Sequence, residues 1–400
     1  MLRSKFHLEK CNKAPIKHNP DFVLDNFVEA EMKSVLRPLY LAQYLSLAPK
    51  YSIRYDLITS NSHKFNVFVC LCAVGISTTW WFSSVLDYLI KAEGMYAATV
   101  FAYSVTLLCA IILNSFITTS HSNMNANLIV LIQRIQKRFI FVKFDTRDIA
   151  KGNWLFVIII STYNVAHFAA RFLDTNIKVI STIVTHLIYL SIDFNSIVAI
   201  RMIHLLGKLI ETWISELKCS CCANCFDIEA KDYLRKIIIS YDELMEAIKI
   251  CNKIFRVPIF FTVLSSFFHA FVIVQGAISV SLLMLRHRQY LQMPVWKKSL
   301  YAAQLIWIKN LTLVAILCME SENIHLKVKN AQVACIVLCA RERTSELSQL
   351  MRRQEQWAGP ERGEGWLRAA GLFSVDAALP PRFLAVLGTY IVAILQLHFL

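Results

Sequence analysis

Two oppositely charged residues stand inside apolar stretches of this sequence: Asp193 in SIDFNS and Lys309 in WIKNL. An ionised side chain is costly in an apolar environment, so it usually marks an ion pair or a functional site. Either the two residues pair across a helix bundle, or Asp193 lies at the boundary of its stretch. Sequence position favours the boundary interpretation.

A second group of residues that could do chemistry is the cysteine run KCSCCANCF, which contains Cys219, Cys221, Cys222 and Cys225. Four thiolates can bind zinc, but this spacing lacks the usual two-part pattern of a zinc site. Free thiols are the favoured interpretation, acylation next to a membrane is the alternative, and we predict no metal site.

Motifs of the common enzyme classes do not occur in the sequence. It has no G-x-S-x-G, no phosphate-binding glycine loop and no H-E-x-x-H. We therefore expect a protein that is not an enzyme and that needs no cofactor.

The composition explains which elements carry these residues. Of the 400 residues, 56% are hydrophobic and only 18% are charged, which is typical of a protein with several membrane spans. About 20 apolar residues cross the hydrocarbon layer as a helix. Seven stretches qualify, at roughly 65–90, 95–119, 153–174, 176–200, 257–284, 299–319 and 383–400.

The placement of the basic residues predicts the orientation. Of the 42 lysines and arginines, 34 fall in the N-terminal region and in alternate connections, which the positive-inside rule assigns to the cytoplasm. We expect a cytoplasmic N-terminus without a cleaved signal peptide and, after seven spans, an extracellular C-terminus. The net charge of +14 is thus attributed to membrane flanks, and we predict no nucleic-acid partner.

The sequence divides into regions of different pattern. Residues 1–64 form a cytoplasmic N-terminal region with a short interfacial or re-entrant helix near 35–48, which contains Pro38. Residues 65–319 form a six-helix bundle, within which 201–256 has the periodicity of cytoplasmic amphipathic helices. The remaining regions are a cytoplasmic helix at 320–357, a glycine-containing loop at 358–382 and a last helix at 383–400.

Aromatic and hydrogen-bonding residues collect in the outer halves of the middle spans. A bundle that opens outward with such a lining is a candidate pocket for a small molecule. The candidate residues are His167, Arg171, Thr185, His186, Tyr189, His269, Gln275, Tyr301, Gln304 and Trp307.

The last helix has two different faces. At 100° per residue, Ala385, Thr389, Ala393, Gln396 and Leu400 fall on one narrow stripe, which is typical of a water path or of a helix–helix contact. Tyr390 lies about 100° from this stripe, where it can bridge to a neighbouring helix.

The ending Thr389-Tyr390-IVAIL-Gln396-Leu397 resembles the signature of insect gustatory receptors, with leucine in place of the final phenylalanine. The stretches YDELMEAIKICNKIFRVPIFFTVLSSF and AAGLFSVDAALPPRFLAVLG are similar to segments of the same family. The resemblance covers about the C-terminal half of the chain.

This resemblance implies a seven-span, tastant-gated, nonselective cation channel in the plasma membrane of sensory neurons. Four subunits, identical or mixed, would surround a central pore, and the cytoplasmic helices would hold them together. The implied pore residues are Thr389, Tyr390, Gln396 and Leu397, and the helical stripe adds Ala393 and Leu400. The candidate pocket has aromatic and hydrogen-bonding residues but no acidic cluster, which favours a bitter plant compound as the ligand. A sugar-sensing receptor, an olfactory receptor subunit and a G-protein-coupled receptor are the alternatives; the last lacks support because neither Asp-Arg-Tyr nor Asn-Pro-x-x-Tyr is present where it would be expected.

Overall fold

The computed structural model describes residues 26–46, 48–82, 94–172, 179–222, 228–286, 294–342, 368–369 and 372–399. Its helices are α3 (Ala30–Leu45), α4 (His63–Trp80), α6 (Gly94–Ser120), α7 (Ser122–Lys137), α8 (Thr146–Phe172), α9 (Val179–Cys222), α10 (Ile228–Arg286), α11 (Pro294–Glu342) and α13 (Leu379–Phe399). Two small antiparallel hairpins complete it: β1 (Ser52–Arg54) with β2 (Leu57–Thr59), and β3 (Arg368–Ala369) with β4 (Phe373–Ser374).

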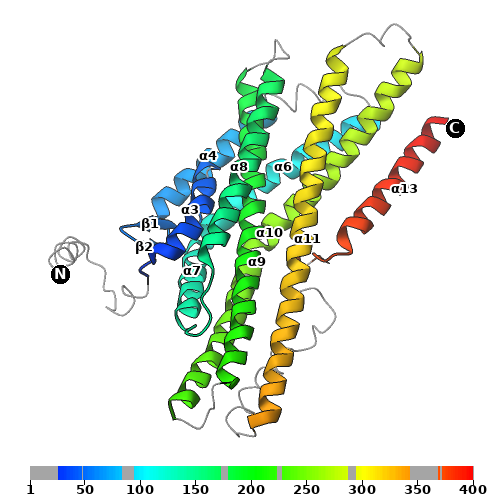
Figure 1. Ribbon diagram of the computed structural model, residues 1–400. Coiled ribbons are helices and arrows are strands. Elements are labelled where there is room, and N and C mark those ends of the chain that lie inside the picture. Colours follow the sequence, from blue (N-terminus) through cyan, green and yellow to red (C-terminus); the bar gives the residue numbers. More distant parts are fainter. Residues whose placement is uncertain are drawn as a thin grey trace.

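Three very long helices form the axis of the molecule (Figure 1). Helices α9, α10 and α11 contain 44, 59 and 49 residues. At 1.5 Å per residue, α10 is about 88 Å long, whereas the hydrocarbon layer of a membrane is about 30 Å thick. Each apolar stretch therefore continues without a break into an amphipathic helix, and the two parts form one element.

Six helices in the described part of the chain are long and apolar enough to cross a membrane. They correspond to six of the seven predicted stretches: Ala97–Ser120, Thr146–Ala169, Ile183–Cys219, Arg235–Ile278, Gln304–Val337 and Leu379–Gln396. The first predicted stretch, 65–90, begins in α4, and its last residues lie outside the described residues. The fold is thus all-α with transmembrane character.

A layer of shorter elements, among them α3, α4 and α7, lies along one side of the middle of this bundle (Figure 1). The predicted helix near 35–48 is α3, and it contributes Val35, Leu36 and Leu39 to the main core. The amide of Asn153 in α8 donates to the carbonyl of Val35 at 2.8 Å. Helix α7 was not predicted, because the segment after the second stretch reads as a basic loop. Its apolar face, which includes the buried Leu128, Ile132 and Ile135, packs mainly on α10.

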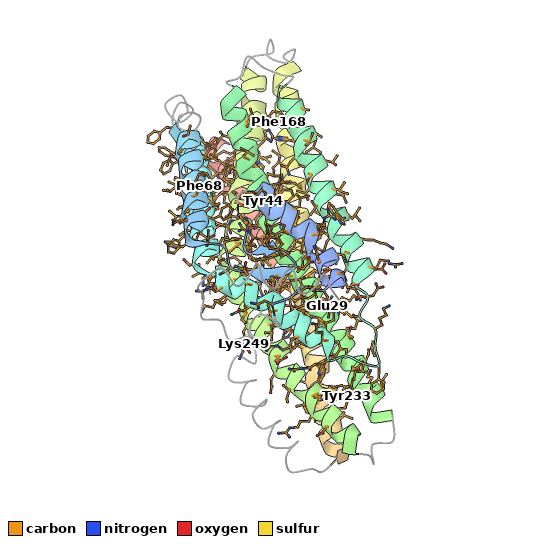
Figure 2. All side chains as sticks on the ribbon, turned by 90° about the vertical axis from the view of Figure 1, so that its left-hand side faces the viewer. Glu29, Tyr44, Phe68, Phe168, Tyr233 and Lys249 are labelled. Atoms are coloured by element: carbon orange, nitrogen blue, oxygen red, sulfur yellow. The ribbon has the colours of Figure 1, made fainter. Side chains whose placement is uncertain are left out.

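Helix α13 lies at the edge of the bundle (Figure 1). It begins at Leu379 and not at 383, because Pro380 and Pro381 fall in the first turn, where a helix needs no backbone donors. Part of the predicted loop at 358–382 therefore belongs to the helix, and part to the β3–β4 hairpin. Figure 2, turned by 90°, shows Phe168 toward one end of the bundle and Tyr233 toward the other.

Candidate functional site

A polar centre made of Asp193, Lys309 and Asn164 lies inside the bundle. The Lys309 ammonium pairs with the Asp193 carboxylate, and both side chains are almost fully buried, at 7% and 5% exposed. The boundary interpretation of Asp193 is therefore wrong. The sequence alone could not decide this, because residues 116 positions apart meet only when α9 and α11 pack together.

Further contacts compensate the cost of burying these two charges. The Asn164 amide, on α8, donates to the same carboxylate oxygen at 3.0 Å. The Lys309 ammonium also lies 5.5 Å from the centre of the Tyr163 ring, within range of a cation–π contact. The polar centre thus joins three helices, and a buried pair of this kind persists only when its remaining hydrogen bonds are satisfied.

Asp193 also forms part of the wall of a small cavity, here called the central cavity. Its lining is mostly polar and comprises Tyr103, Leu107, Tyr189, Ile192, Asp193, Thr262, Ser265, Ser266, Asn310 and Leu313. The free space is enough for about one water molecule. The arrangement combines one carboxylate with several hydroxyl groups, which are groups that can exchange hydrogen bonds with a polar ligand.

Most predicted pocket residues whose side chains are described contact other residues of the bundle and do not line this cavity. Thr185 accepts a hydrogen bond from Trp80 at 2.8 Å, and the His167 and His186 rings lie 4.8 Å apart. His269 stacks on Tyr103, with ring centres 5.2 Å apart and planes 9° apart.

The remaining candidates lie in different places. Gln275 is a buried partner of Tyr390, and Trp307 packs in a cluster with Phe383 and Leu387 of α13. Gln304 is half-buried on α11, and the side chains of Arg171 and Tyr301 lie outside the described residues. Of the eight candidates whose side chains are described, Tyr189 is the one that lines the central cavity.

Several cavity residues were missed by sequence reasoning. Thr262, Ser265 and Ser266 are three and four positions apart on α10, so they share one face of that helix. This spacing was the available signal. No sequence signal marked Tyr103 or Asn310 as cavity residues, because single polar residues are common in apolar helices.

Helix α13 attaches to the bundle by one stripe only. Phe383, Leu387 and Ile394 are buried, whereas the predicted pore residues Thr389, Ala393 and Gln396 are exposed. On the helical wheel these exposed residues lie roughly opposite the buried stripe. The Leu397 side chain and Leu400 lie outside the described residues.

Tyr390 does contact a neighbouring helix. Its ring lies 4.0 Å from that of Phe271 on α10, and its hydroxyl donates to Gln275 at 3.3 Å. Its position, about 100° from the Thr389 stripe, therefore places it at the junction of α13 with α10.

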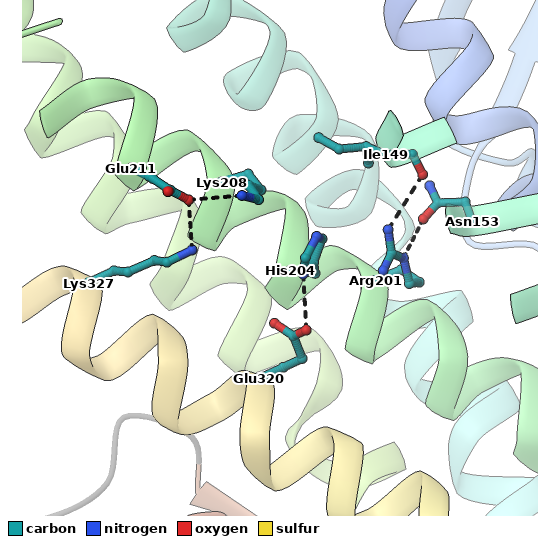
Figure 3. A network of polar contacts seen from close by, with 8 residues as sticks. All are labelled: Ile149, Asn153, Arg201, His204, Lys208, Glu211, Glu320 and Lys327. Carbon is teal, nitrogen blue, oxygen red and sulfur yellow. Dashed lines mark hydrogen bonds and ion pairs between the residues drawn. The ribbon is translucent and has the colours of Figure 1, made fainter. Parts of the chain in front are cut away.

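A polar network continues along α9 beyond the polar centre (Figure 3). Arg201 donates to Asn153 at 2.5 Å and to the Ile149 carbonyl at 3.5 Å. His204 lies 3.0 Å from Glu320, and Glu211 contacts Lys208 and Lys327, both at 3.1 Å. These contacts connect α9 with α8 and α11 where the predicted bundle passes into its extension.

The predicted cysteine cluster lies at the end of α9. Cys219 is exposed, and Cys221 and Cys222 belong to the last turn of the helix. Cys225 lies outside the described residues, so the structure leaves the choice between free and acylated thiols open.

The fold and the polar centre define an all-α protein with transmembrane character and a charged, hydroxyl-lined interior. No protein-family model matches the chain, and no curated protein matches it at a significant level.

Proposed function

We propose that this chain is a subunit of a tastant-gated, nonselective cation channel of the gustatory receptor type. In this proposal four subunits, identical or mixed, each place α13 around a central pore in the plasma membrane of a sensory neuron. The observation that carries the proposal is the one-sided attachment of α13.

The exposed face of α13 supports a pore because it contains Gln396. A primary amide that faces lipid has no hydrogen-bond partner and is costly in hydrocarbon. Thr389 does not require a partner outside α13, because its hydroxyl donates to the Ala385 carbonyl of its own helix at 3.1 Å. Gln396 therefore favours a water-filled path or another subunit on this face.

A second exposed surface supports assembly into an oligomer. In the extension of α11, Met319, Leu326 and Val333 are exposed and recur every seven residues, followed by Ile336 and Val337. Apolar residues at this spacing form a seam that packs against another helix. In the proposed channel, this seam contributes to the cytoplasmic contacts between subunits.

The ligand class has two candidates. The aromatic and hydrogen-bonding residues of the predicted pocket, which include no acidic cluster, favour a bitter plant compound. The central cavity favours a sugar or another polyhydroxylated compound, because Tyr103, Tyr189, Thr262, Ser265 and Ser266 present hydroxyl groups beside Asp193.

The pore proposal is tested by whole-cell recording of the full chain with Gln396→Ala. We expect altered rectification or cation selectivity at unchanged surface expression, because the substitution removes an amide from the ion path. Leu395→Ala is the matched control: this neighbour is also exposed, but it lies about 100° away on the helix. Unchanged permeation in Gln396→Ala, or equal effects of both variants, would contradict the pore assignment.

The ligand proposal is tested by calcium imaging of cells that express the chain, with a panel of bitter compounds and sugars. Ser266→Ala removes one hydroxyl from the cavity and should lower sensitivity to a polyhydroxylated agonist about fivefold, since one hydrogen bond contributes about 1 kcal/mol. Ser281→Ala, on an exposed part of α10, is the control. If Ser266→Ala leaves agonist sensitivity unchanged, the central cavity is not the ligand site.

A further inference from the structure

A second cavity in the bundle, here called the Pro258 cavity, lies where α6, α9 and α10 meet. Its lining includes the polar residues Asn114, Ser191, Asn195 and Thr262 from these three helices, together with Pro258 and other apolar residues. It is a different space from the central cavity, although Ile192 and Thr262 line both.

Two buried amide oxygens in the wall of this cavity are not hydrogen-bonded within the described residues: Oδ1 of Asn114 and Oδ1 of Asn195. The two side chains are only 7% and 4% exposed. For Asn195 the orientation of the amide is determined by its other end, because Nδ2 donates to the Ser191 carbonyl at 2.8 Å. Exchanging its oxygen and nitrogen would break that bond, so the unpaired atom is an acceptor.

The neighbouring groups do not donate to these two oxygens. The Thr262 hydroxyl lies 2.7 Å from that of Ser196 and 3.0 Å from the Pro258 carbonyl. Pro258 itself has no N–H, so the Ile254 carbonyl one turn earlier in α10 also loses its helical donor. The junction of the three helices is therefore rich in acceptors.

An unpaired buried acceptor costs about 1–3 kcal/mol, and buried polar groups almost always find a partner. The missing partner must donate two hydrogen bonds and fit a space of about one water molecule. No carboxylate is among the residues that line this cavity in the described part of the chain. A monovalent cation would consequently lack a counter-charge in an apolar surrounding, which disfavours it.

We propose that a water molecule binds in the Pro258 cavity, donates to Asn114 and Asn195, and links α6 to α9 beside α10. The water completes the hydrogen bonding of this junction, in the way that buried waters commonly do. This assignment does not depend on the channel proposal.

The test is a double-mutant cycle on the full-length protein, purified in lipid nanodiscs, with the unfolding temperature as readout. Asn114→Leu and Asn195→Leu each remove one amide and keep a similar volume. A shared water predicts that each single variant lowers the unfolding temperature by about 2–4 °C, because the remaining amide loses its bridge. It also predicts that the double variant is no worse than the more affected single variant.

Gln133→Met, combined with Asn114→Leu, is the control pair. Gln133 is a buried amide on α7 that donates to the Phe27 carbonyl at 2.7 Å and does not line the cavity. The effects of this pair should add.

Three results would overturn the assignment. A higher unfolding temperature in the single variants would show that the oxygens are unpaired in a dry cavity. Additive losses in the Asn114 and Asn195 pair would show that no group is shared. A stabilisation by sodium chloride that choline chloride does not reproduce, and that Asn195→Leu abolishes, would assign a cation in place of the water.

Discussion

Two lysines are buried in the part of the chain that the structure describes, and the contacts that surround their ammonium groups differ. Lys309, in the apolar part of α11, pairs with the Asp193 carboxylate. Lys50, between α3 and β1, is 1% exposed and has no carboxylate paired with it among the described residues. Its ammonium lies 4.6 Å from the centre of the Phe255 ring on α10.

The main chain at Lys50 explains why the residue is enclosed. Its N–H donates to the Gln43 side chain at 3.2 Å, and its carbonyl accepts from the Ser122 hydroxyl at 3.4 Å. The backbone is thus held between α3 and α7, and the side chain is directed onto α10. Burial lowers the pKa of Lys50 to about 8, and the nearby Cys251 thiol opposes this change only in part.

The comparison shows that a buried charge can be retained in two ways. In the polar centre the partner is a full opposite charge, so removing either residue leaves the other uncompensated. At Lys50 the partner is an aromatic ring, so the ammonium is itself the unfavourable group. We therefore expect substitution of Lys309 to lower the stability of the protein and substitution of Lys50 to raise it.

The largest effect is expected for Lys309→Met, which leaves the Asp193 carboxylate buried without a cation. We expect a loss of about 3–5 kcal/mol in the free energy of unfolding, measured by thermal unfolding in nanodiscs. Asp193→Leu combined with Lys309→Met should recover most of this loss, because it removes both charges. A single variant that unfolds like the wild type would contradict the buried pair.

Glu216 extends the comparison to a buried carboxylate that is held by the main chain. It is fully buried and accepts from the N–H groups of Ile140, Phe141 and Val142 at 2.6, 2.8 and 2.7 Å, and from the Tyr233 hydroxyl. Glu216→Gln replaces one acceptor oxygen with a donor that faces these groups. We expect a loss of about 2–3 kcal/mol in the same assay.

The control for Glu216→Gln is Glu211→Gln on the same helix. Glu211 makes exposed ion pairs, so its loss should change the free energy of unfolding by less than about 1 kcal/mol. Equal effects of the two substitutions would show that the three backbone contacts of Glu216 contribute little.

Lys50→Met should stabilise the protein at neutral pH, on the order of 2 kcal/mol, because it removes a desolvated charge and keeps the apolar stem. The sign of the pH dependence follows from the lowered pKa of Lys50. Between about pH 8 and the ordinary lysine pKa of 10.5, the unfolded chain binds more protons than the folded one. The wild type should therefore gain stability as the pH rises through this window.

The Lys50→Met variant should lack this gain. Its advantage over the wild type should be largest below pH 8 and should decline toward pH 10.5. Unfolding temperatures of both proteins across pH 7–10 measure this difference. A variant that is less stable than the wild type at pH 7 would show that the ammonium contributes a favourable contact.

The smallest effect is expected for Lys33→Ala, which removes the ion pair with Asp56 at the β1–β2 turn. Both side chains are nearly half exposed, at 49% and 44%, so the loss should be about 0–1 kcal/mol and should vanish at high salt. A larger loss would indicate that Asp56, which has a positive φ of 61°, needs this contact to keep the turn.

Much of the fold follows from the pattern of apolar residues. The long apolar stretches predicted the long apolar helices α6, α8, α9, α10, α11 and α13, because helical length and hydropathy are local properties. Helix α7 was missed because it is short and because polar residues such as Asn125 and Gln133 occupy buried positions in it. Only packing shows why they are tolerated, since each amide donates to a backbone carbonyl.

The candidate site was predictable only in part. Asp193 and Lys309 stood out as charges in apolar stretches, and the choice between boundary and pair was made incorrectly. The predicted pocket contained the right kinds of residue, but contacts with other bundle residues, such as that of Thr185 with Trp80, use their polar groups within the bundle.

By itself the sequence determined the lengths and apolar character of the helices, the two faces of α13 and the presence of charges within the bundle. Each of these depends on residues close together in the chain. The tertiary structure alone decided which charges meet, which face of α13 is covered, and that Lys50 is enclosed while Lys33 is exposed. These outcomes depend on contacts between residues far apart in the chain, and the energy of a charge depends on its surroundings more than on its neighbours in sequence.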